Sequence, residues 1–597
     1  MKSSVFYAIE LILLFNICWV GVSSGTILET SWIRVNHLGY TEKSIKVAVF
    51  ATKSEEKPSA FEVVHLSSGE TVYKGNHIIE HGKYAAFSNI FRLNFSDFEK
   101  SGTYFIRSGN TSSPAFKINN GVYDGAADFV LKYMRQQRCG YNPYLIDSCH
   151  THDGFIMGHP TLDSTYINVV GGWHDASDYL QYVTTSANAT YQMLFAWQEN
   201  PGAFADKYDA DGKPGTNGIP DILDEAKWGL DWLDRMNPSY GFMFNQIADD
   251  RDHAGLRLPT LDSVSYGKGL QRPVYFVTGK QQGFGKYKNR STGVSSTAAK
   301  YASAFALGSS ILKEYYPEFS KKIAVKAVEA FEYAKTDLGV NQTASNRAPY
   351  FYEEDNYIDD MELAAIQLYQ NGGDSVYLKD AVYWGDLEPV TPWMVYNGAR
   401  HYQYYPFVNL GHYKVAKFTH DSIVRIKYIN YLKSGLESIY GRAEKNGFLM
   451  GIPFIWCSNN LNVAALTQLR LYHQLSGDGK YLEMEAALRD WLFGCNPWGT
   501  SMIVGFPADT DTPTDPHSSF TVKYQYPIDG GLVDGPVYTS IFKNLIGLRL
   551  AYDDEYAPFQ SELCVYHDDY GDYSTNEPTM DGTASLSFYL SAMVKVK

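Results

Sequence analysis

The chain has 597 residues with 51 Lys and Arg against 66 Asp and Glu, which gives a formal net charge of −15. Nucleic acid binding needs a basic surface, so this balance argues against a nucleic acid partner. With 45% hydrophobic and 20% charged residues, the composition is typical of a globular protein with a large core and not of disorder. The aromatic content of 15% indicates either a binding surface built from rings or a core rich in them.

The first residues have the pattern of a secretory signal peptide. A charged residue precedes an apolar stretch at 5–22, interrupted by Glu10, and small residues follow at 23–25. We therefore predict a signal peptide over 1–25 and a secreted or periplasmic protein, with no membrane span after cleavage. Cleavage removes Cys18 and leaves five cysteines. An odd number cannot all pair internally, so the chain is not a disulfide scaffold.

The region 26–118 alternates between apolar and polar residues in short runs separated by Gly, Ser, Asn and Pro. This period of two, in segments spaced about ten residues apart, predicts a small all-β sandwich. The predicted strands lie within 33–40, 45–51, 61–66, 89–95, 102–108 and 114–119.

From 119 to the end, apolar residues recur at spacings of three and four, which is typical of amphipathic helices. The ten clearest segments are 123–137, 186–198, 220–236, 296–315, 321–338, 360–370, 422–440, 460–475, 481–493 and 583–593. About a dozen antiparallel helices joined by long loops predict a helical toroid with a cleft formed by those loops. Long loops inside a compact domain often carry function.

Two loops are candidates for catalysis. "GGWHDASDYLQY" at 171–182 contains Asp175 and Asp178, and "YSTNEPTMDG" at 573–582 contains Glu577. Hydrolysis of a glycoside with inversion needs one carboxylate to activate water and one protonated carboxyl to donate to the leaving oxygen, roughly 6.5–9.5 Å apart. Composition alone leaves the alternative of solvated loop carboxylates open, because 66 acidic residues produce many such pairs.

At these residues the chain resembles glycoside hydrolase family 9. The first loop is similar to the family's base loop and the second to its acid loop, and the region 26–118 is similar to the immunoglobulin-like domain that precedes the catalytic domain in one branch. The resemblance implies an (α/α)6 barrel over 119–597 that hydrolyses β-1,4-glucans with inversion. Carried over, Asp178 is the general base, Asp175 helps position the water and Glu577 is the general acid.

Two positions depart from the family pattern. In "DPHSSF" the chain keeps His517 but has Ser518 and Ser519 where the family usually has His and Arg. An arginine at this point offers substrate hydroxyls a rigid fork of donors, so its absence leaves the glycan preference open. In "WCSNN", Cys457 replaces the usual Gly, and we interpret it as a small buried residue.

A metal site is predicted from Cys139, Cys149, His150 and His174. Two thiolates and two imidazoles complete the tetrahedral set of a structural zinc site. A disulfide between the two cysteines is the alternative for an exported protein. The resemblance favours zinc, because this branch of the family holds zinc with the same pattern. His174 directly precedes Asp175, so a metal there would fix the base loop.

A calcium site is a further candidate, in the loop 209–221, whose oxygen ligands are of the type that calcium takes. The candidate ligands are Asp209, Asp211 and Asp221, with Asn217 as a fourth. The alternative is an ordinary acidic turn that caps the next helix. Asp359 and Asp360 mark a second candidate of the same kind. We expect no organic cofactor.

The sequence therefore predicts a β-1,4-glucanase acting on cellulose, mixed-linkage glucan or xyloglucan, endo-acting and monomeric. The candidate substrate-binding residues are Trp173, Trp456, His517 and Tyr573, with Trp393 and Trp498 as further cleft rings. Two alternatives remain. One is an exo-acting β-glycosidase on short gluco- or amino-sugar oligomers, and the other is an inactive glycan-binding protein, which would not need the three carboxylates.

Overall fold

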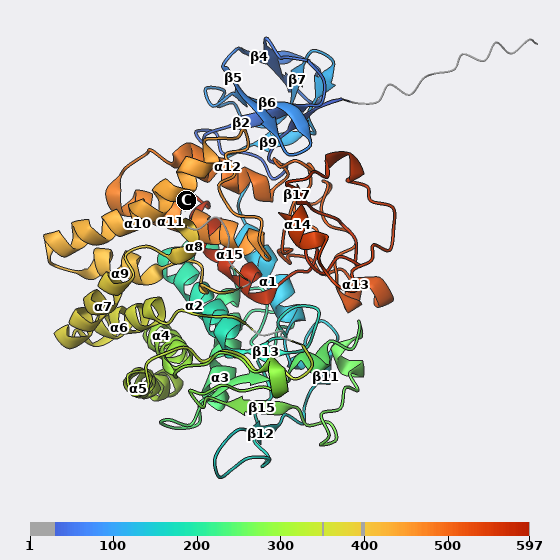
Figure 1. Cartoon of the computed structure of the whole chain (residues 1–597). Coiled ribbons are helices and arrows are strands. Elements are labelled where there is room, and N and C mark those ends of the chain that lie inside the picture. Colours follow the sequence, from blue (N-terminus) through green and yellow to red (C-terminus); the bar gives the residue numbers. More distant parts are fainter. Residues whose placement is uncertain (1–29, 349–351, 396–399, 401, 596–597) are drawn as a thin grey trace, which may run out of the picture.

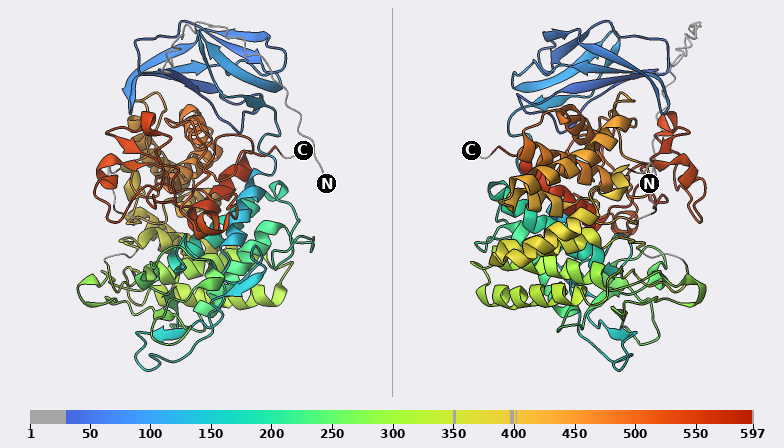
Figure 2. Two further views of the ribbon diagram at one scale, coloured as in Figure 1. Left: turned by 90° about the vertical axis from the view of Figure 1, so that its right-hand side faces the viewer. Right: turned by 60° about the vertical axis from the view of Figure 1, so that its left-hand side comes forward.

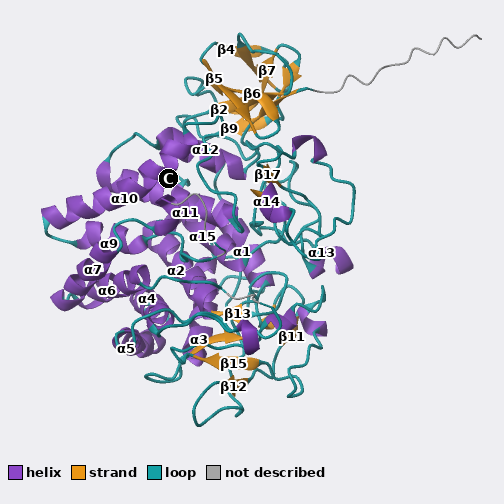
Figure 3. Ribbon diagram, in the orientation of Figure 1, coloured by secondary structure: helices purple, strands orange, loops and turns teal. Residues whose placement is uncertain are grey.

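The computed structural model describes residues 30–348, 352–395, 400 and 402–595, so the predicted signal peptide lies outside the described residues. Strands occupy the chain from Ser31 to Ile118, and a mainly helical part follows from Ala126 (Figure 1). Figure 3 shows the two kinds of structure separated in space, with a few short strands among the helices. Within the part of the chain that is described, no helix is both long and apolar enough to cross a membrane.

The first part is a sandwich of two antiparallel sheets. One sheet has the order β1 (Ser31–Arg34), β2 (Val47–Thr52), β6 (Phe87–Asn94) and β5 (Ile78–Tyr84). The other has the order β4 (Thr71–Gly75), β3 (Phe61–His65), β7 (Gly102–Ser108) and β8 (Thr111–Ser112), with β9 (Phe116–Ile118) also paired to β7.

The predicted period of two is visible in β7, where Tyr104, Ile106 and Ser108 are buried and the residues between them are partly exposed. The inner faces of both sheets meet in one apolar core, to which Phe50 and Val63 belong. Alternate burial of this kind is the expected pattern for strands that face a core on one side.

The sandwich packs against one end of the helical part, as both views in Figure 2 show. Arg34 Nη2 donates to the carbonyl of Pro497 over 2.9 Å, and Asn36 Nδ2 donates to Asp490 Oδ1 over 2.7 Å. Arg92, which is 4% exposed, forms an ion pair of 2.8 Å with Glu483. Because Arg34, Asn36 and Arg92 are buried and paired across the boundary, these contacts attach the two parts to each other in the structure.

Six helices of the second part contact one another in a closed cycle, in which each helix packs against the next and the last returns to the first. In cycle order they are α2 (Val183–Glu199), α4 (Ser295–Ile311), α6 (Ile358–Gly372), α9 (Leu410–Phe418), α11 (Ser458–Ser476) and α15 (Met580–Ala592). Each also packs against a second helix. In the same order these are α3 (Asp221–Met236), α5 (Pro317–Ala334), α7 (Ser375–Leu387), α10 (Ser422–Ala443), α12 (Leu482–Leu492) and α1 (Ala126–Gln136).

Burial separates the two sets of helices. In α4 every residue except Ser310 is buried, whereas α5 buries only one stripe that includes Ile323, Ala327, Ala330 and Phe331. A helix that is buried all round lies inside a fold, and one with a single buried stripe lies at its surface. The cycle that contains α2 and α15 is therefore the inner layer.

All ten predicted helical segments overlap observed helices, but α7 and α9 were not predicted. In α7, Val, Tyr and Trp side chains favour strands over helices, and α9 is only nine residues long and contains Gly411. Their helical state depends on packing against α6.

Shorter elements lie in the connecting loops. The short helices are α8 (Pro392–Val395), α13 (Ser519–Tyr524) and α14 (Thr539–Phe542), and the short 3-10 turns are Pro201–Ala203, Asp250–Asp252, Pro259–Leu261, Gly285–Tyr287 and Ala557–Phe559. The short strands form three sheets: β10 (Gly140–Asn142) with β11 (Asp147–Cys149); β12 (Phe155–Met157), β15 (Pro273–Phe276), β14 (Phe244–Ile247) and β13 (Gln181–Tyr182); and β16 (Val537–Tyr538) with β17 (Cys564–Val565).

Candidate active site and metal centre

The two predicted catalytic loops meet because α2 and α15 are neighbours. The base loop leads into α2 and the acid loop leads into α15, and these helices pack together. The amide of Ser177 donates to Glu577 Oε1 over 3.0 Å, and the amide of Met580 donates to the carbonyl of Asp175 over 2.9 Å. The structure thus brings together residues that are 400 positions apart in the sequence.

A cavity of about 530 Å³ opens where the loops meet. Its lining residues include Asp178 and Glu577 together with the predicted substrate-binding residues Trp456, His517 and Tyr573. The rings of Trp456 and Tyr573 lie 5.7 Å apart at an interplanar angle of 33°, and His517 lies 6.1 Å from Tyr573. The cavity therefore combines carboxylates with a wall of rings, which suits a ligand with flat apolar faces and polar edges.

Glu577 is placed as a proton donor. Burial raises the pKa of its carboxyl, the charge of His517 lowers it, and the charge of Asp178 raises it again, so that the net shift is upward. A carboxyl with a raised pKa keeps its proton at a pH at which an ordinary glutamate has lost it.

Asp178 is fixed by two contacts. The amide of Leu180 donates to Asp178 Oδ1 over 3.0 Å, and His253 Nε2 lies 3.4 Å from Asp178 Oδ2. Burial alone would lower the pKa of His253, but the hydrogen bond and the charge of Asp178 raise it to about 9. His253 thus lies beside the carboxylate that is the candidate general base.

Asp175 is buried, with 3% of its surface exposed. Its carboxyl accepts hydrogen bonds from the hydroxyl of Thr185, over 2.9 Å, and from the hydroxyl of Tyr352. Burial, followed by the charges of Asp178 and Asp581, raises its pKa well above the ordinary value. Asp175 is not among the residues that line the cavity.

Three of the predicted cleft rings lie in the core, so these predictions are wrong. Trp173, Trp393 and Trp498 are at most 1% exposed. Trp173 Nε1 donates to Glu225 over 2.7 Å, Trp393 Nε1 to the carbonyl of Phe407 over 2.6 Å, and Trp498 Nε1 to Gln560 over 3.2 Å. With the indole nitrogen satisfied inside the protein, each ring serves packing and not the cleft.

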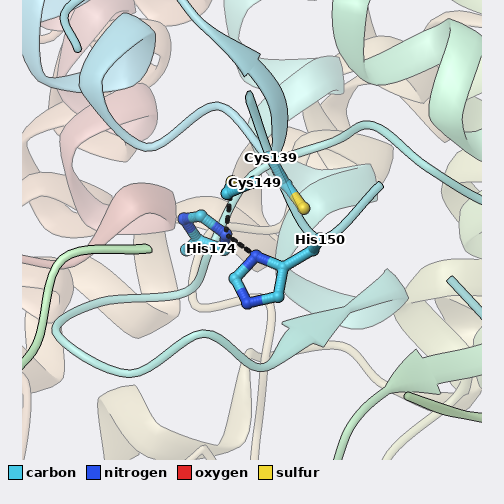
Figure 4. Close-up of side chains that lie close together, drawn as sticks. All are labelled: Cys139, Cys149, His150 and His174. Atoms are coloured by element: carbon cyan, nitrogen blue, oxygen red, sulfur yellow. Dashed lines mark hydrogen bonds between the residues drawn. The ribbon is translucent and has the colours of Figure 1, made fainter. Parts of the chain in front are cut away.

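The predicted zinc ligands come together (Figure 4). One ligand atom from each of Cys139, Cys149, His150 and His174 lies within 4.8 Å of the others. His174 Nε2 lies 3.2 Å from His150 Nδ1 and 3.8 Å from Cys149 Sγ, and the two cysteines are not joined by a disulfide. The arrangement thus departs from the predicted disulfide alternative and offers the donor set of a tetrahedral metal site.

The second nitrogen of His150 faces away from this cluster. His150 Nε2 contacts Asp262 Oδ2 at 3.0 Å, and both side chains are at most 6% exposed. A carboxylate behind a histidine ligand fixes the orientation of the ring and the position of its proton, and such a pair is common at metal sites.

The predicted calcium ligands are not gathered in the same way. Among the described residues, the Cys and His set above is the only group of three or more His, Cys, Asp or Glu side chains close enough to hold an ion. Asp221 is paired with Arg135 at 3.2 Å and accepts the amides of Lys207 and Tyr208. Its oxygens are already used, so the structure contradicts a site made by Asp209, Asp211 and Asp221. The loop is an acidic turn, but it does not cap α3, whose N-cap residue is Pro220 with no side-chain cap hydrogen bond.

At the second candidate calcium site the cation is a lysine. Lys300 Nζ lies 2.5 Å from Asp360 Oδ2 and also donates to Glu354. The ammonium of Lys300 pairs with the buried carboxylates of Glu354 and Asp360. Lys300 and Asp360 belong to different helices and are 60 residues apart in the sequence, so the sequence does not reveal their contact.

The ionisable cavity residues that the sequence did not reveal are Asp252, His253 and Arg257. They lie in the long connection between β14 and β15, which contains no apolar periodicity. The signal that was available is the length of this connection, because long loops in a compact domain tend to carry function.

Two family models match the chain, one for each of its two parts. Residues 123–590 match the model of glycosyl hydrolase family 9, and residues 28–113 match the model of the cellulase N-terminal ig-like domain. The chain belongs to glycosyl hydrolase family 9. The resemblance seen in the sequence is confirmed, and the protein is a glycoside hydrolase of the cellulase type.

Several characterised relatives align over most of the chain. A cellodextrinase of Butyrivibrio fibrisolvens is 28% identical over 501 residues, which cover 79% of this chain and 84% of the relative. A xyloglucan-specific endo-beta-1,4-glucanase of Bacteroides ovatus is 24% identical over 613 residues, covering 96% and 95%.

Solved structures show the same fold. A metagenome-derived glycoside hydrolase family 9 endoglucanase aligns with a TM-score of 0.76 at 24% identity, covering 95% of this chain and 99% of the other. A Zn-binding triple mutant of the family 9 endoglucanase J30 aligns with a TM-score of 0.75 at 24% identity, covering 93% and 99%. The sandwich followed by the helical domain is therefore an arrangement found in other members of the family.

Proposed function

We propose that the protein hydrolyses β-1,4-glucan chains from within, with inversion at the anomeric carbon. The hydrogen bond from the Ser177 amide to Glu577 Oε1 is the observation that carries this proposal, because it holds the acid against the base loop at one cavity. The named substrates of the relatives, cellodextrins, xyloglucan and β-1,4-glucan, support a β-1,4-linked glucan as the substrate class.

In the proposed reaction Glu577 gives its proton to the glycosidic oxygen while the bond from that oxygen to the anomeric carbon breaks. A water molecule forms the new bond to the same carbon from the opposite face and loses a proton to Asp178. The raised pKa of Glu577 keeps the donor protonated, and the contacts of Asp178 with Leu180 and His253 orient the base.

Asp175 has a supporting role in this scheme. Its carboxyl is held by Thr185 and Tyr352, and its carbonyl accepts the amide of Met580 on the acid side. We propose that Asp175 fixes the loop that carries Asp178, and through this loop the position of the attacking water.

We also propose that the helical part is an (α/α)6 barrel. The closed cycle from α2 to α15, in which each inner helix packs against at least one helix outside the cycle, supports this arrangement. The catalytic loops then lie where successive inner helices begin, at one end of the barrel.

For the metal centre we propose zinc, held by Cys139, Cys149, His150 and His174. Their donor atoms lie within 4.8 Å of one another, and two sulfur and two nitrogen donors are the set that zinc prefers. A zinc ion bound here supplies a structural cross-link and leaves no coordination position for substrate. Elemental analysis should find about one zinc per chain.

The predicted signal peptide supports export from the cytoplasm, and we propose that the mature enzyme begins near residue 26. N-terminal sequencing of the exported protein tests this. A chain that retains residues 1–25 would contradict it.

The substrate and mode of attack are tested with a panel of β-1,4-glucan, mixed-linkage glucan, xyloglucan and chito-oligosaccharides. We expect a mixture of product lengths from polymers and the α anomer as the first product in proton NMR. Release of a single short product from one chain end would support the exo-acting alternative, and a β product would exclude inversion.

A further inference from the structure

The segment 249–262 lies between the cavity and the Cys and His cluster and touches both. At one end, Asp252 lines the cavity, and its Oδ2 accepts the amide of Tyr179 over 2.7 Å. Tyr179 directly follows Asp178 in the base loop. At the other end, Asp262 Oδ2 contacts His150 Nε2 at 3.0 Å.

Arg257 joins these two ends. Its Nε donates to Asp262 Oδ1 over 2.6 Å, and its Nη2 donates to Asp252 Oδ1 over 2.8 Å. Its Nη1 donates to the carbonyls of Asp252 and Gly255 over 3.1 and 3.0 Å. The guanidinium also lies 4.8 Å from the centre of the Tyr179 ring. One planar group thus contacts both carboxylates and the base loop.

The three side chains that make these contacts are largely buried. Asp252, Asp262 and Arg257 have side chains that are 0%, 4% and 16% exposed. Two buried carboxylates without a cation repel each other and are costly to desolvate. The rigid fork of arginine can bridge them, whereas a lysine ammonium is a single point charge on a flexible chain.

We propose that Arg257 is a positioning residue of the reaction, which ties the base Asp178 to the metal cluster through Asp252 and Asp262. The proposal rests on the function proposed above. The base loop is then held at two points. His174, a member of the cluster, precedes Asp175, and the amide of Tyr179 is held by Asp252. Asp178 lies between these two points in the sequence. When both points are held, the carboxylate of Asp178 keeps its direction toward the attacking water.

The test compares Arg257→Gln with Arg251→Gln. Arg251 lies in the same segment, makes a two-point contact with Asp249 at 2.6–2.7 Å and stacks on Tyr266 at 4.8 Å, but it contacts neither Asp252 nor Asp262 and does not line the cavity. We expect Arg257→Gln to lower kcat by about 10- to 100-fold, as other outer-sphere changes do, with KM changed less than about threefold. Arg251→Gln should keep kcat within about twofold.

Two further variants separate positioning from a general loss of structure. Arg257→Lys should recover part of kcat, because the ammonium can pair with one carboxylate but cannot bridge both. Asp262→Asn should lower kcat and weaken metal retention against a chelator, and combining it with Arg257→Gln should cost little beyond the larger single effect. If Arg257→Gln does not fold, Arg257→Lys carries the same comparison with Arg251→Gln.

Three results would overturn the proposal: a rise in KM with kcat retained, equal losses in Arg257→Gln and Arg251→Gln, or fully additive losses in the double variant. Failure of the proposed function is seen separately and earlier. It appears as wild-type protein that cleaves none of the β-glucans or that contains no metal.

Discussion

The two walls of the cavity are built in different ways. The base wall is held by long-range contacts, in which Asp252 and Asp262 connect the base loop to a Cys and His cluster. The acid wall has a side-chain network that is local in sequence, around Asp572, whose carboxylate accepts from His567 Nδ1 over 2.7 Å and from the hydroxyls of Ser574 and Thr575 over 2.6 and 2.7 Å. All of these side-chain partners lie within five residues of Asp572. Backbone amides of distant segments also contact this loop, among them Ser177 N to Glu577 Oε1 and Asp534 N to the carbonyl of Glu577.

The two walls therefore depend on different groups for their shape. A loop fixed by ionised side chains and a metal cluster responds to loss of the metal or of a charge anywhere along the connection. The side-chain network around Asp572 is closed within a few residues and includes no member of the Cys and His cluster, so it responds to substitution of those residues and not to loss of a metal from the cluster. Variants on the two sides should therefore differ in their dependence on metal.

The largest effect is expected from the acid itself. Glu577→Gln keeps an acceptor for the Ser177 amide but has no carboxylic proton to donate, so kcat should fall by about 10² to 10⁴-fold while substrate still binds. Turnover of β-glucan and calorimetric binding measure the two parts. Glu555→Gln is the control, because Glu555 also has a raised pKa, about 7, yet does not line the cavity. Retained turnover in Glu577→Gln would refute the acid assignment.

The next effect tests the base wall. Cys149→Ser removes one sulfur donor from the cluster, so we expect metal to be lost and kcat to fall by at least about tenfold. Elemental analysis and kinetics check this together. Cys564→Ser removes an equally buried thiol from β17, outside the cluster, and should retain the metal. Equal metal content in both variants would contradict the four-ligand site.

Features that are local in the sequence could be predicted, and features that depend on contacts between distant residues could not. The carboxylates of both loops were found because each loop is a short contiguous motif. Trp173 and Trp456 both lie in loops, and only the structure distinguishes their roles. Trp173 is buried against Glu225, 52 residues away, whereas Trp456 lines the cavity.

The same limit applies to cations and helices. The acidic pair at Asp360 has the composition of a calcium site, but Lys300 from another helix supplies the charge. The four-ligand cluster could be predicted because its residues lie within 36 positions and are rare types, whereas the bridge through Arg257 could not. Periodicity predicted ten helices and missed α7 and α9, whose helical state depends on packing.

A smaller effect is expected on stability at the acid wall. Burial would raise the pKa of Asp572, but the hydrogen bond and charge of His567, with Ser574 and Thr575, lower it. A carboxylate whose pKa is lowered by folding stabilises the protein above its unfolded value of about 3.9, and this contribution is lost as the pH falls through the folded pKa.

Asp572→Asn should therefore destabilise the enzyme at neutral pH by about 1–3 kcal/mol, measured by urea unfolding, and reduce the loss of stability on acidification. Metal content should not change, because Asp572 has no contact with the cluster. Asp529→Asn breaks an exposed ion pair with Lys132 and should cost less than about 1 kcal/mol. Similar stabilities for the two variants would show that the acid wall does not depend on Asp572.

The smallest expected effect is a displacement of the pH profile. Burial raises the pKa of Glu577, the charge of His517 lowers it, and the charge of Asp178 raises it. An acid catalyst works while it is protonated, so activity falls as the pH rises through the pKa of Glu577. His517→Gln removes the lowering charge and should move the alkaline limb of kcat/KM to higher pH. The exposed His152 does not line the cavity, so His152→Gln should leave the limb in place. A limb that moves to lower pH in His517→Gln would mean that another group, and not Glu577, is the acid whose titration limits the rate.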